Sequence, residues 1–211
     1  MITEQMLDVL RFDMKAHLGK KRFLHTVGVE KEMRALAEIY MPSKIHDAAC
    51  AGLLHDITKE FSYEQQIALA EKYKIEISFP SKDSAALFHS KTGAFFAKER
   101  YPFLVSDEIF SAIWKHTTAS AKMSLMDKLL YLADFIEEGR TYKSCVSLRY
   151  EFYSGLENVI DDKLCFLNEI MIKAYDYSLE ALKRDGLYIS PSTLEAKEEA
   201  IKERFAYQGK K

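Results

Sequence analysis

Histidines and aspartates are the residues of this 211-residue chain that point most directly to chemistry. Four histidines stand beside an acid, a small polar residue or an apolar helix face, and they are His25, His55, His89 and His116. Two aspartates, Asp56 and Asp134, emerge from apolar runs of the kind that form buried helices. Imidazole and carboxylate groups that meet inside a helical bundle are common ligands of metal ions. The sequence therefore predicts a metal site.

The run at residues 48–56, Ala-Ala-Cys-Ala-Gly-Leu-Leu-His-Asp, carries the strongest single signal. Its apolar part predicts a buried helix that ends in His55 and Asp56. A carboxylate in a protein core is costly unless it is paired or binds a metal. A second His-Asp pair, His46-Asp47, begins nine residues before His55. At about 100° per residue this spacing places the two histidines on opposite faces of the helix, so we assign the earlier pair to a structural or surface role.

The mixed histidine and aspartate set indicates which metals and which chemistry to expect. It suits iron, manganese, zinc or cobalt. Such ligation leaves coordination positions open for water and for a phosphoryl oxygen, as metal-assisted hydrolysis requires. The cysteines, Cys50, Cys145 and Cys165, have no zinc-site or disulfide spacing, so we expect reduced thiols in a cytoplasmic protein.

Helical periodicity runs through nearly the whole sequence and predicts an all-α protein. The predicted helices cover residues 3–15, 20–40, 43–56, 62–73, 84–101, 107–116, 124–137, part of 144–153, 161–185 and 193–205. The predicted caps are Ser43, Ser62 with Gln65, and Thr193 at helix starts, and Gly139 and Gly186 at helix ends. Residues 74–79 alternate apolar and polar side chains, which allows a short extended piece.

Length and composition favour one domain, residues 1–211, with 48% hydrophobic residues to form its core. The polar stretch 140–144 separates a metal-site core at about 20–140 from helices at about 144–205, which we expect to pack on that core. The net charge of -2, without blocks of like charge, predicts no nucleic-acid and no membrane partner. No apolar stretch reaches the roughly 20 residues of a membrane span, and the first helix does not resemble a signal peptide.

The ordered set of histidines and aspartates resembles the HD-domain phosphohydrolase superfamily, and within it the bacterial YqeK family. The resemblance rests on Arg-Phe-Leu-His-Thr at 22–26, Ala-Gly-Leu-Leu-His-Asp-Ile-Thr-Lys at 51–59, Phe-His-Ser at 88–90, Lys-His-Thr-Thr at 115–118 and Tyr-Leu-Ala-Asp-Phe-Ile-Glu-Glu-Gly-Arg at 131–140. These motifs span most of residues 20–140, and the ordered set is specific where a single His-Asp dipeptide is not. The resemblance implies an HD-domain helical bundle with a C-terminal helical extension.

The same resemblance implies a symmetrical bis(5'-nucleosyl)-tetraphosphatase, which cuts diadenosine tetraphosphate into two ADP at a centre of two iron ions. Manganese or cobalt are the implied substitutes for iron. The implied ligands of the first metal are His25, His55, Asp56 and Asp134, and those of the second are His89 and His116 with Asp56 as the bridge. Two metals can share a hydroxide that attacks a phosphoryl group, and they also neutralise charge on the phosphates.

Polar residues beside the ligands are the expected substrate-binding groups. Lys59 follows Asp56 by three residues and could reach a phosphate, so we expect both to act in catalysis. The other expected contacts to phosphate or nucleoside are Arg22, Thr117, Thr118 and Arg140.

Two other functions stay open. The first is another HD-type nucleotide phosphohydrolase, such as a nucleotidase or a deoxynucleotide phosphohydrolase. A guanosine alarmone hydrolase is disfavoured because those enzymes usually carry an acidic pair soon after the His-Asp, where this chain has Lys59. The second is a non-enzymatic helical interaction module that binds metal. The helices after residue 140 could complete the bundle, build a nucleoside pocket or form the face of a homodimer.

Overall fold

The structure, a computed structural model, describes residues 1–76, 85–159 and 162–208. Within these ranges it contains helices and no strand, so the predicted all-α class is confirmed. The elements are α1 (Glu4–His17), α2 (Lys20–Tyr40), the 3-10 helix η1 (Pro42–Lys44), α3 (Ile45–Leu54), α4 (Tyr63–Lys72), α5 (Ala85–Arg100), α6 (Asp107–Lys115), α7 (Leu125–Ile136), α8 (Lys143–Leu156), α9 (Lys163–Arg184) and α10 (Pro191–Gln208).

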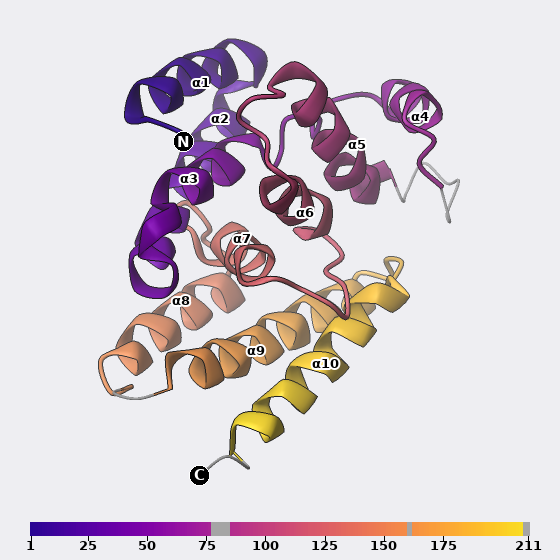
Figure 1. Cartoon of the computed structure of the whole chain (residues 1–211). Coiled ribbons are helices and arrows are strands. Elements are labelled where there is room, and N and C mark those ends of the chain that lie inside the picture. Colours follow the sequence, from indigo (N-terminus) through magenta and orange to yellow (C-terminus); the bar gives the residue numbers. More distant parts are fainter. Residues whose placement is uncertain (77–84, 160–161, 209–211) are drawn as a thin grey trace.

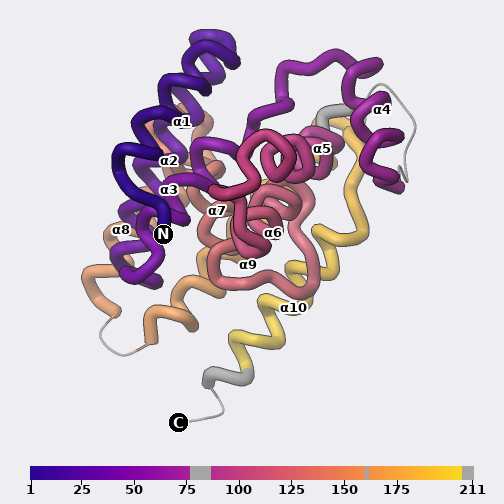
Figure 2. The backbone as a smooth tube through the Cα atoms, turned by 45° about the horizontal axis from the view of Figure 1, so that its top comes forward, coloured from indigo at the N-terminus to yellow at the C-terminus, as the bar shows by residue number. Residues whose placement is uncertain are grey.

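The helices form two layers (Figure 1). In the upper layer α1, α2 and α3 lie on one side and α4 and α5 on the other, with α6 and α7 between them (Figure 2). The helices α8, α9 and α10 form the lower layer. Helix α2 packs against α3 and α7, and α6 packs against α5 and α7, so these five helices enclose one interior region. Among the helices of the described residues, none is both long and apolar enough to cross a membrane.

Helices α3 and α7 are buried on most sides, which is typical of helices at the centre of a bundle. Every residue from 48 to 54 in α3 is buried. His55 and Asp56 follow α3 directly, and Asp134 lies in the last turn of α7. The two most buried helices therefore deliver both aspartates and one histidine to the interior.

Gly52 sets how closely α2 and α3 approach each other. A Cβ atom at Gly52 would lie 2.8 Å from the Cα of Glu30 and 3.1 Å from the carbonyl oxygen of Val29, both in the backbone of α2. A side chain at this position would push the two helices apart. The glycine therefore permits the contact that brings His25 on α2 next to His55 at the end of α3.

Two of the predicted caps, one at a helix start and one at a helix end, are present as expected. Ser62 and Gln65 form the capping box at the start of α4. Gly186 adopts a φ of 63° just after α9, a conformation that favours glycine. The extended piece predicted at residues 74–79 lies partly outside the described residues.

Three other predicted caps are wrong. Ser43 lies inside the 3-10 turn η1, so α3 begins at Ile45 with Lys44 as its N-cap. Thr193 lies inside α10, which starts two residues earlier at a proline; proline suits the first position of a helix because its missing N–H is not needed there. Helix α7 ends at Ile136 with Glu137 as its C-cap, so Gly139 lies beyond the stop.

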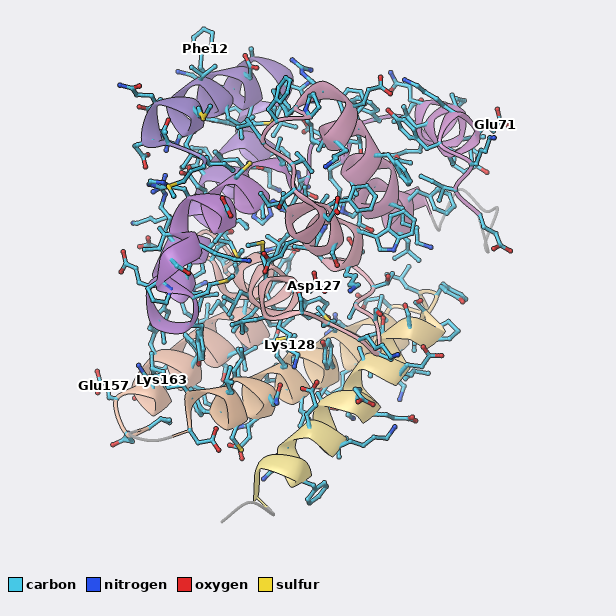
Figure 3. The ribbon with its side chains drawn as sticks, viewed as in Figure 1. Phe12, Glu71, Asp127, Lys128, Glu157 and Lys163 are labelled. Atoms are coloured by element: carbon cyan, nitrogen blue, oxygen red, sulfur yellow. The ribbon has the colours of Figure 1, made fainter. Side chains whose placement is uncertain are left out.

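A hydrogen bond and an ion pair join α7 to the lower layer. The Lys128 ammonium donates to the Asn168 side chain of α9 over 3.0 Å and pairs with Glu203 of α10. Figure 3 labels Asp127 and Lys128 at this junction, and it shows Phe12 pointing outward from α1. The C-terminal helices thus lie against the helix that carries Asp134. That the chain forms one domain stays a prediction.

Candidate metal centre

Five elements of the upper layer each bring a predicted ligand to one place. Helix α2 carries His25, the end of α3 carries the His55-Asp56 pair, α5 carries His89, His116 follows α6 directly, and α7 carries Asp134. Apart from His25 and Asp134, which are partly exposed, all of these residues are buried. The structure therefore brings all six predicted ligands together. Two of them, His25 and Asp134, lie 3.0 Å apart although 109 positions separate them in the sequence.

His25, His55 and Asp134 form one group of side chains. The Nε2 atoms of the two histidines lie 3.3 Å apart. Oδ1 of Asp134 lies 3.0 Å from Nε2 of His25 and 3.9 Å from Nε2 of His55. These three ligand atoms lie within 4.8 Å of one another, which is close enough to hold a single metal ion.

His89 and His116 form a second group, with Nε2 atoms 3.0 Å apart. Asp56 lies between the two groups. Its Oδ2 atom is 3.3 Å from Nε2 of His55 and 3.7 Å from Nε2 of His25. Its Oδ1 atom is 3.1 Å from Nε2 of His89 and 3.7 Å from Nε2 of His116. Each carboxylate oxygen thus faces a different pair of histidines, which is the geometry that a bridging ligand requires.

The hydrogen bonds of His55 and His116 show that these residues fit a metal ion. Nδ1 of His55 donates to the carbonyl oxygen of Gly52, and Nδ1 of His116 donates to that of Ile113, both over 2.7 Å. A neutral imidazole that carries its proton on Nδ1 presents a lone pair at Nε2. Both lone pairs converge on the Asp56 carboxylate, so acceptors face acceptors, and a cation between them would bind both. The ligand assignments themselves stay predictions.

Burial and neighbouring charges shift the pKa values in this cluster. Burial would raise the pKa of Asp56, but the surrounding imidazoles hold it well below its ordinary value. Burial lowers the pKa of His55, and burial with the nearby Lys59 lowers that of His89 to about 3. An ionised carboxylate and neutral imidazoles are the protonation states that bind metals.

His25 differs from the other histidines. Burial lowers its pKa, but hydrogen bonds to Asp134 and Glu137 outweigh burial and raise the pKa to about 9. Burial would also raise the pKa of Asp134, but Arg140 and His25 hold it well below its usual range. The two groups are therefore stabilised as an ion pair.

Three cationic side chains surround the histidine and aspartate cluster. The Arg22 guanidinium donates to Oδ2 of Asp56 over 2.5 Å. The Arg140 guanidinium donates to the Asp134 carboxylate over 2.5 Å and to its carbonyl oxygen over 2.8 Å. The Lys59 ammonium lies 3.3 Å from both ring nitrogens of His89. An anionic ligand at the cluster would meet positive charge on several sides.

The two predicted threonines lie differently. The Thr117 hydroxyl is 3.1 Å from Nε2 of His89, at the edge of the cluster. The carbonyl oxygen of Thr118 accepts hydrogen bonds from the hydroxyls of Ser192 and Thr193, at the start of α10. Of these two threonines, only Thr117 has a contact with a ligand histidine among the described interactions. The role of Thr118 in substrate binding stays a prediction.

His46 lies away from the cluster, as its place on the opposite face of α3 predicts. Its side chain is 43% exposed, and its Nδ1 bonds to the carbonyl oxygen of Ile2 over 3.0 Å. The second His-Asp dipeptide of the chain therefore packs against the N-terminus.

A buried polar network beside the cluster was not anticipated from the sequence. The Thr58 hydroxyl donates to the carbonyl oxygen of His89 over 3.0 Å and lies 3.1 Å from the Thr92 hydroxyl. The Gln66 amide donates to the carbonyl oxygen of Thr58 over 2.5 Å and accepts from Thr92. These contacts fasten α4 and α5 to the turn after Asp56. Threonine and glutamine in loops and helices give no sequence signal for such a network.

Comparisons with known proteins show which family this chain is similar to. Residues 22–139 match the HD domain family. The chain is 30% identical, over 85% of its length and 89% of the relative's, to a Bacillus subtilis protein named bis(5'-nucleosyl)-tetraphosphatase, symmetrical. It is 29% identical, over 72% and 79% of the two lengths, to a protein of the same name from Halalkalibacterium halodurans.

A solved structure shares the fold over nearly the whole chain. It is the crystal structure of a predicted HD superfamily hydrolase involved in NAD metabolism from Clostridium acetobutylicum. The two structures agree with a TM-score of 0.80 at 28% identity, over 93% of this chain and 97% of the other. The likeness therefore includes the lower layer of helices as well as the matched family region.

Proposed function

Since the chain belongs to the HD domain family of hydrolases, we propose that it cuts diadenosine tetraphosphate symmetrically into two ADP. The observation that carries the proposal is the position of Asp56, whose two oxygens face two separate pairs of histidines. The side chains of Arg22, Lys59 and Arg140 place positive charge around this cluster. The names of the Bacillus and Halalkalibacterium relatives support the choice of substrate.

The donor set supports two divalent metals, for which we propose iron, with manganese or cobalt as substitutes. His25, His55, Asp56 and Asp134 would hold the first, and His89, His116 and Asp56 the second. When bound, such metals lower the pKa of a coordinated water and neutralise charge on phosphoryl oxygens.

The chain's own cations would bind and orient the polyphosphate. Arg22 and Arg140 present planar guanidinium groups, which match two phosphate oxygens at once. Lys59 adds an ammonium group that reaches the His89 side of the cluster. In the reaction, the oxygen of water bonds to one of the two central phosphorus atoms and the bridging P–O bond breaks. The bridging oxygen leaves with the other half, so each product is ADP.

A substrate panel tests this function directly. The full chain would be loaded with iron, manganese or cobalt and incubated with diadenosine tetraphosphate, ATP, ADP and deoxynucleotides, and the products would be separated by anion-exchange chromatography. We expect ADP as the only product from diadenosine tetraphosphate. Release of ATP and AMP would refute the symmetrical cut. Turnover of mononucleotides alone would indicate a different HD-type phosphohydrolase.

Two variants separate the predicted centre from the other His-Asp pair. His55→Ala should abolish turnover with every metal, because it removes a residue that faces both Asp56 and Asp134. His46→Ala should leave turnover unchanged, because His46 lies at the N-terminus away from the cluster. Equal loss in both variants would mean that the activity does not depend on this centre. The cytoplasmic location and the homodimer stay predictions.

A further inference from the structure

Glu137 is the carboxylate that supports His25 from behind. It follows α7 directly and is 2% exposed. Its Oε1 atom accepts a hydrogen bond from Nδ1 of His25 over 3.0 Å, while Nε2 of the same ring faces Asp134. Its Oε2 atom accepts a second bond from the backbone N–H of Gly139 over 2.6 Å. Both oxygens of this buried acid are therefore held in place.

The neighbouring helix leaves space for this carboxylate at Gly28. A Cβ atom at Gly28 would lie 2.3 Å from Oε2 of Glu137 and 3.0 Å from its Cδ, and the three nearest atoms to that Cβ all belong to Glu137. Gly28 lies in the interior of α2, one turn after His25, where glycine is among the poorest helix formers. Its close contact with Glu137 is the structural reason for a glycine at this position.

The support of His25 is chemically different from that of two other histidines in the cluster. His55 and His116 donate their Nδ1 protons to neutral backbone carbonyls. His25 donates to a carboxylate, which keeps the proton on Nδ1 and makes Nε2 a stronger electron-pair donor when a metal ion takes the place of the Nε2 proton. The geometry points to Glu137 as a positioning residue that sets the orientation and basicity of His25 toward a metal ion. Gly28 leaves the space that the Glu137 carboxylate occupies. This inference rests on the metal-binding part of the proposed function.

A double-mutant cycle tests the inference without relying on turnover. The affinity of the chelator-stripped full chain for cobalt would be measured by titration, with the visible absorption of the bound ion as a second readout. Glu137→Ala should weaken binding by about 10- to 100-fold, the usual effect of losing such an outer partner. Glu137→Gln should weaken binding less, because an amide oxygen can still accept from Nδ1 but carries no charge. Glu138→Gln, at a neighbour whose side chain is 86% exposed, is the matched control and should change nothing.

Gly28→Ala is the decisive variant, because it touches no ligand. Its methyl group should displace the Glu137 carboxylate and weaken cobalt binding at least several-fold. Its resistance to urea should change little, because the better helix propensity of alanine offsets the loss of the hydrogen bond between Glu137 and His25. In the Glu137→Ala background the same substitution should have no further effect on affinity, since the group it would displace is absent.

The outcomes distinguish this inference from the function on which it rests. If the unaltered chain binds no cobalt, the proposed metal-dependent function fails. If it binds cobalt and all variants bind within twofold of it, Glu137 is not a positioning residue. If Gly28→Ala weakens binding equally in both backgrounds, its effect does not pass through Glu137 and the inference is wrong.

Discussion

Replacing Gly52 with alanine tests how closely the two histidine-bearing helices must approach. The new methyl group would meet the backbone of α2 at 2.8 Å from Cα of Glu30, whereas ordinary contacts of a Cβ begin at 3.4 Å. Backbone cannot rotate away as a side chain does. We therefore expect α2 and α3 to separate locally by about 0.6 Å, the difference between these distances.

Two opposing terms decide the effect of Gly52→Ala on stability. Alanine in a helix interior is favoured over glycine by about 1 kcal/mol. Overpacking a close contact costs about 1–3 kcal/mol. We expect a net loss of about 1 kcal/mol in the free energy of unfolding, measured by urea denaturation of protein kept free of metal with a chelator.

The same separation should affect the metal centre more strongly than the fold. Nε2 of His25 and Nε2 of His55 belong to the two helices that move. Metal–ligand distances tolerate only about 0.2 Å, so a shift of several tenths of an ångström should lower cobalt affinity at least tenfold. Gly28→Ala is the comparison for stability, because its methyl group meets a movable side chain instead of backbone. A Gly52→Ala protein that is more stable and binds cobalt normally would refute the reasoning.

Three further predictions address the bridge, the polar network and pH. Asp56→Asn should lower kcat by more than the 10- to 100-fold that is typical when a hydrogen-bond partner of a ligand is lost. It should also reduce the bound metal, measured by elemental analysis, below one ion per chain. If two ions are retained, Asp56 is not the bridge. Gln66→Leu removes the amide partner of a buried carbonyl and of a buried hydroxyl, each of which keeps another partner, so it should cost about 1–3 kcal/mol in urea denaturation; a neutral effect would contradict the network. Burial lowers the pKa of His25, but its two carboxylate neighbours raise it to about 9, above the 6.5 of an unperturbed histidine. In chelator-treated protein this stabilisation is complete below pH 6.5 and is lost as the pH rises toward 9, so the urea midpoint should fall across that range more than in His25→Asn.

Local signals in the sequence were enough to predict most of the helices. The span of α2, from residue 20 to residue 40, matches its prediction because a long amphipathic run ends before a proline. The wrong caps at Ser43 and Thr193 share a cause. Both lie within two residues of a proline that begins a helical turn, and proline at such a position overrides the preference of a nearby hydroxyl residue for the cap.

The centre was predictable to the extent that its residues stand at the ends of apolar runs. That rule located Asp56 and Asp134, and helix geometry set His46 apart. Glu137 was not assigned a role, although it lies three residues after Asp134. Its partner His25 is 112 positions away, and a contact at that distance depends on how α2 crosses α7. Sequence periodicity gives the faces of helices but not their crossing points.

The Thr118 carbonyl, held by two hydroxyls at the start of α10, has a consequence for the order in which the protein forms during synthesis. The loop that follows His116 has its partner about 75 residues later, and His25 has its partner 112 residues later. Contacts across such separations form after the local helices, because a long stretch of chain must close first. While the C-terminal helices are still inside the ribosome, the nascent chain has every ligand and Glu137, but it lacks the two hydroxyls that hold the Thr118 carbonyl. The loop after His116 is therefore fixed later than the ligands themselves, when the start of α10 packs against it.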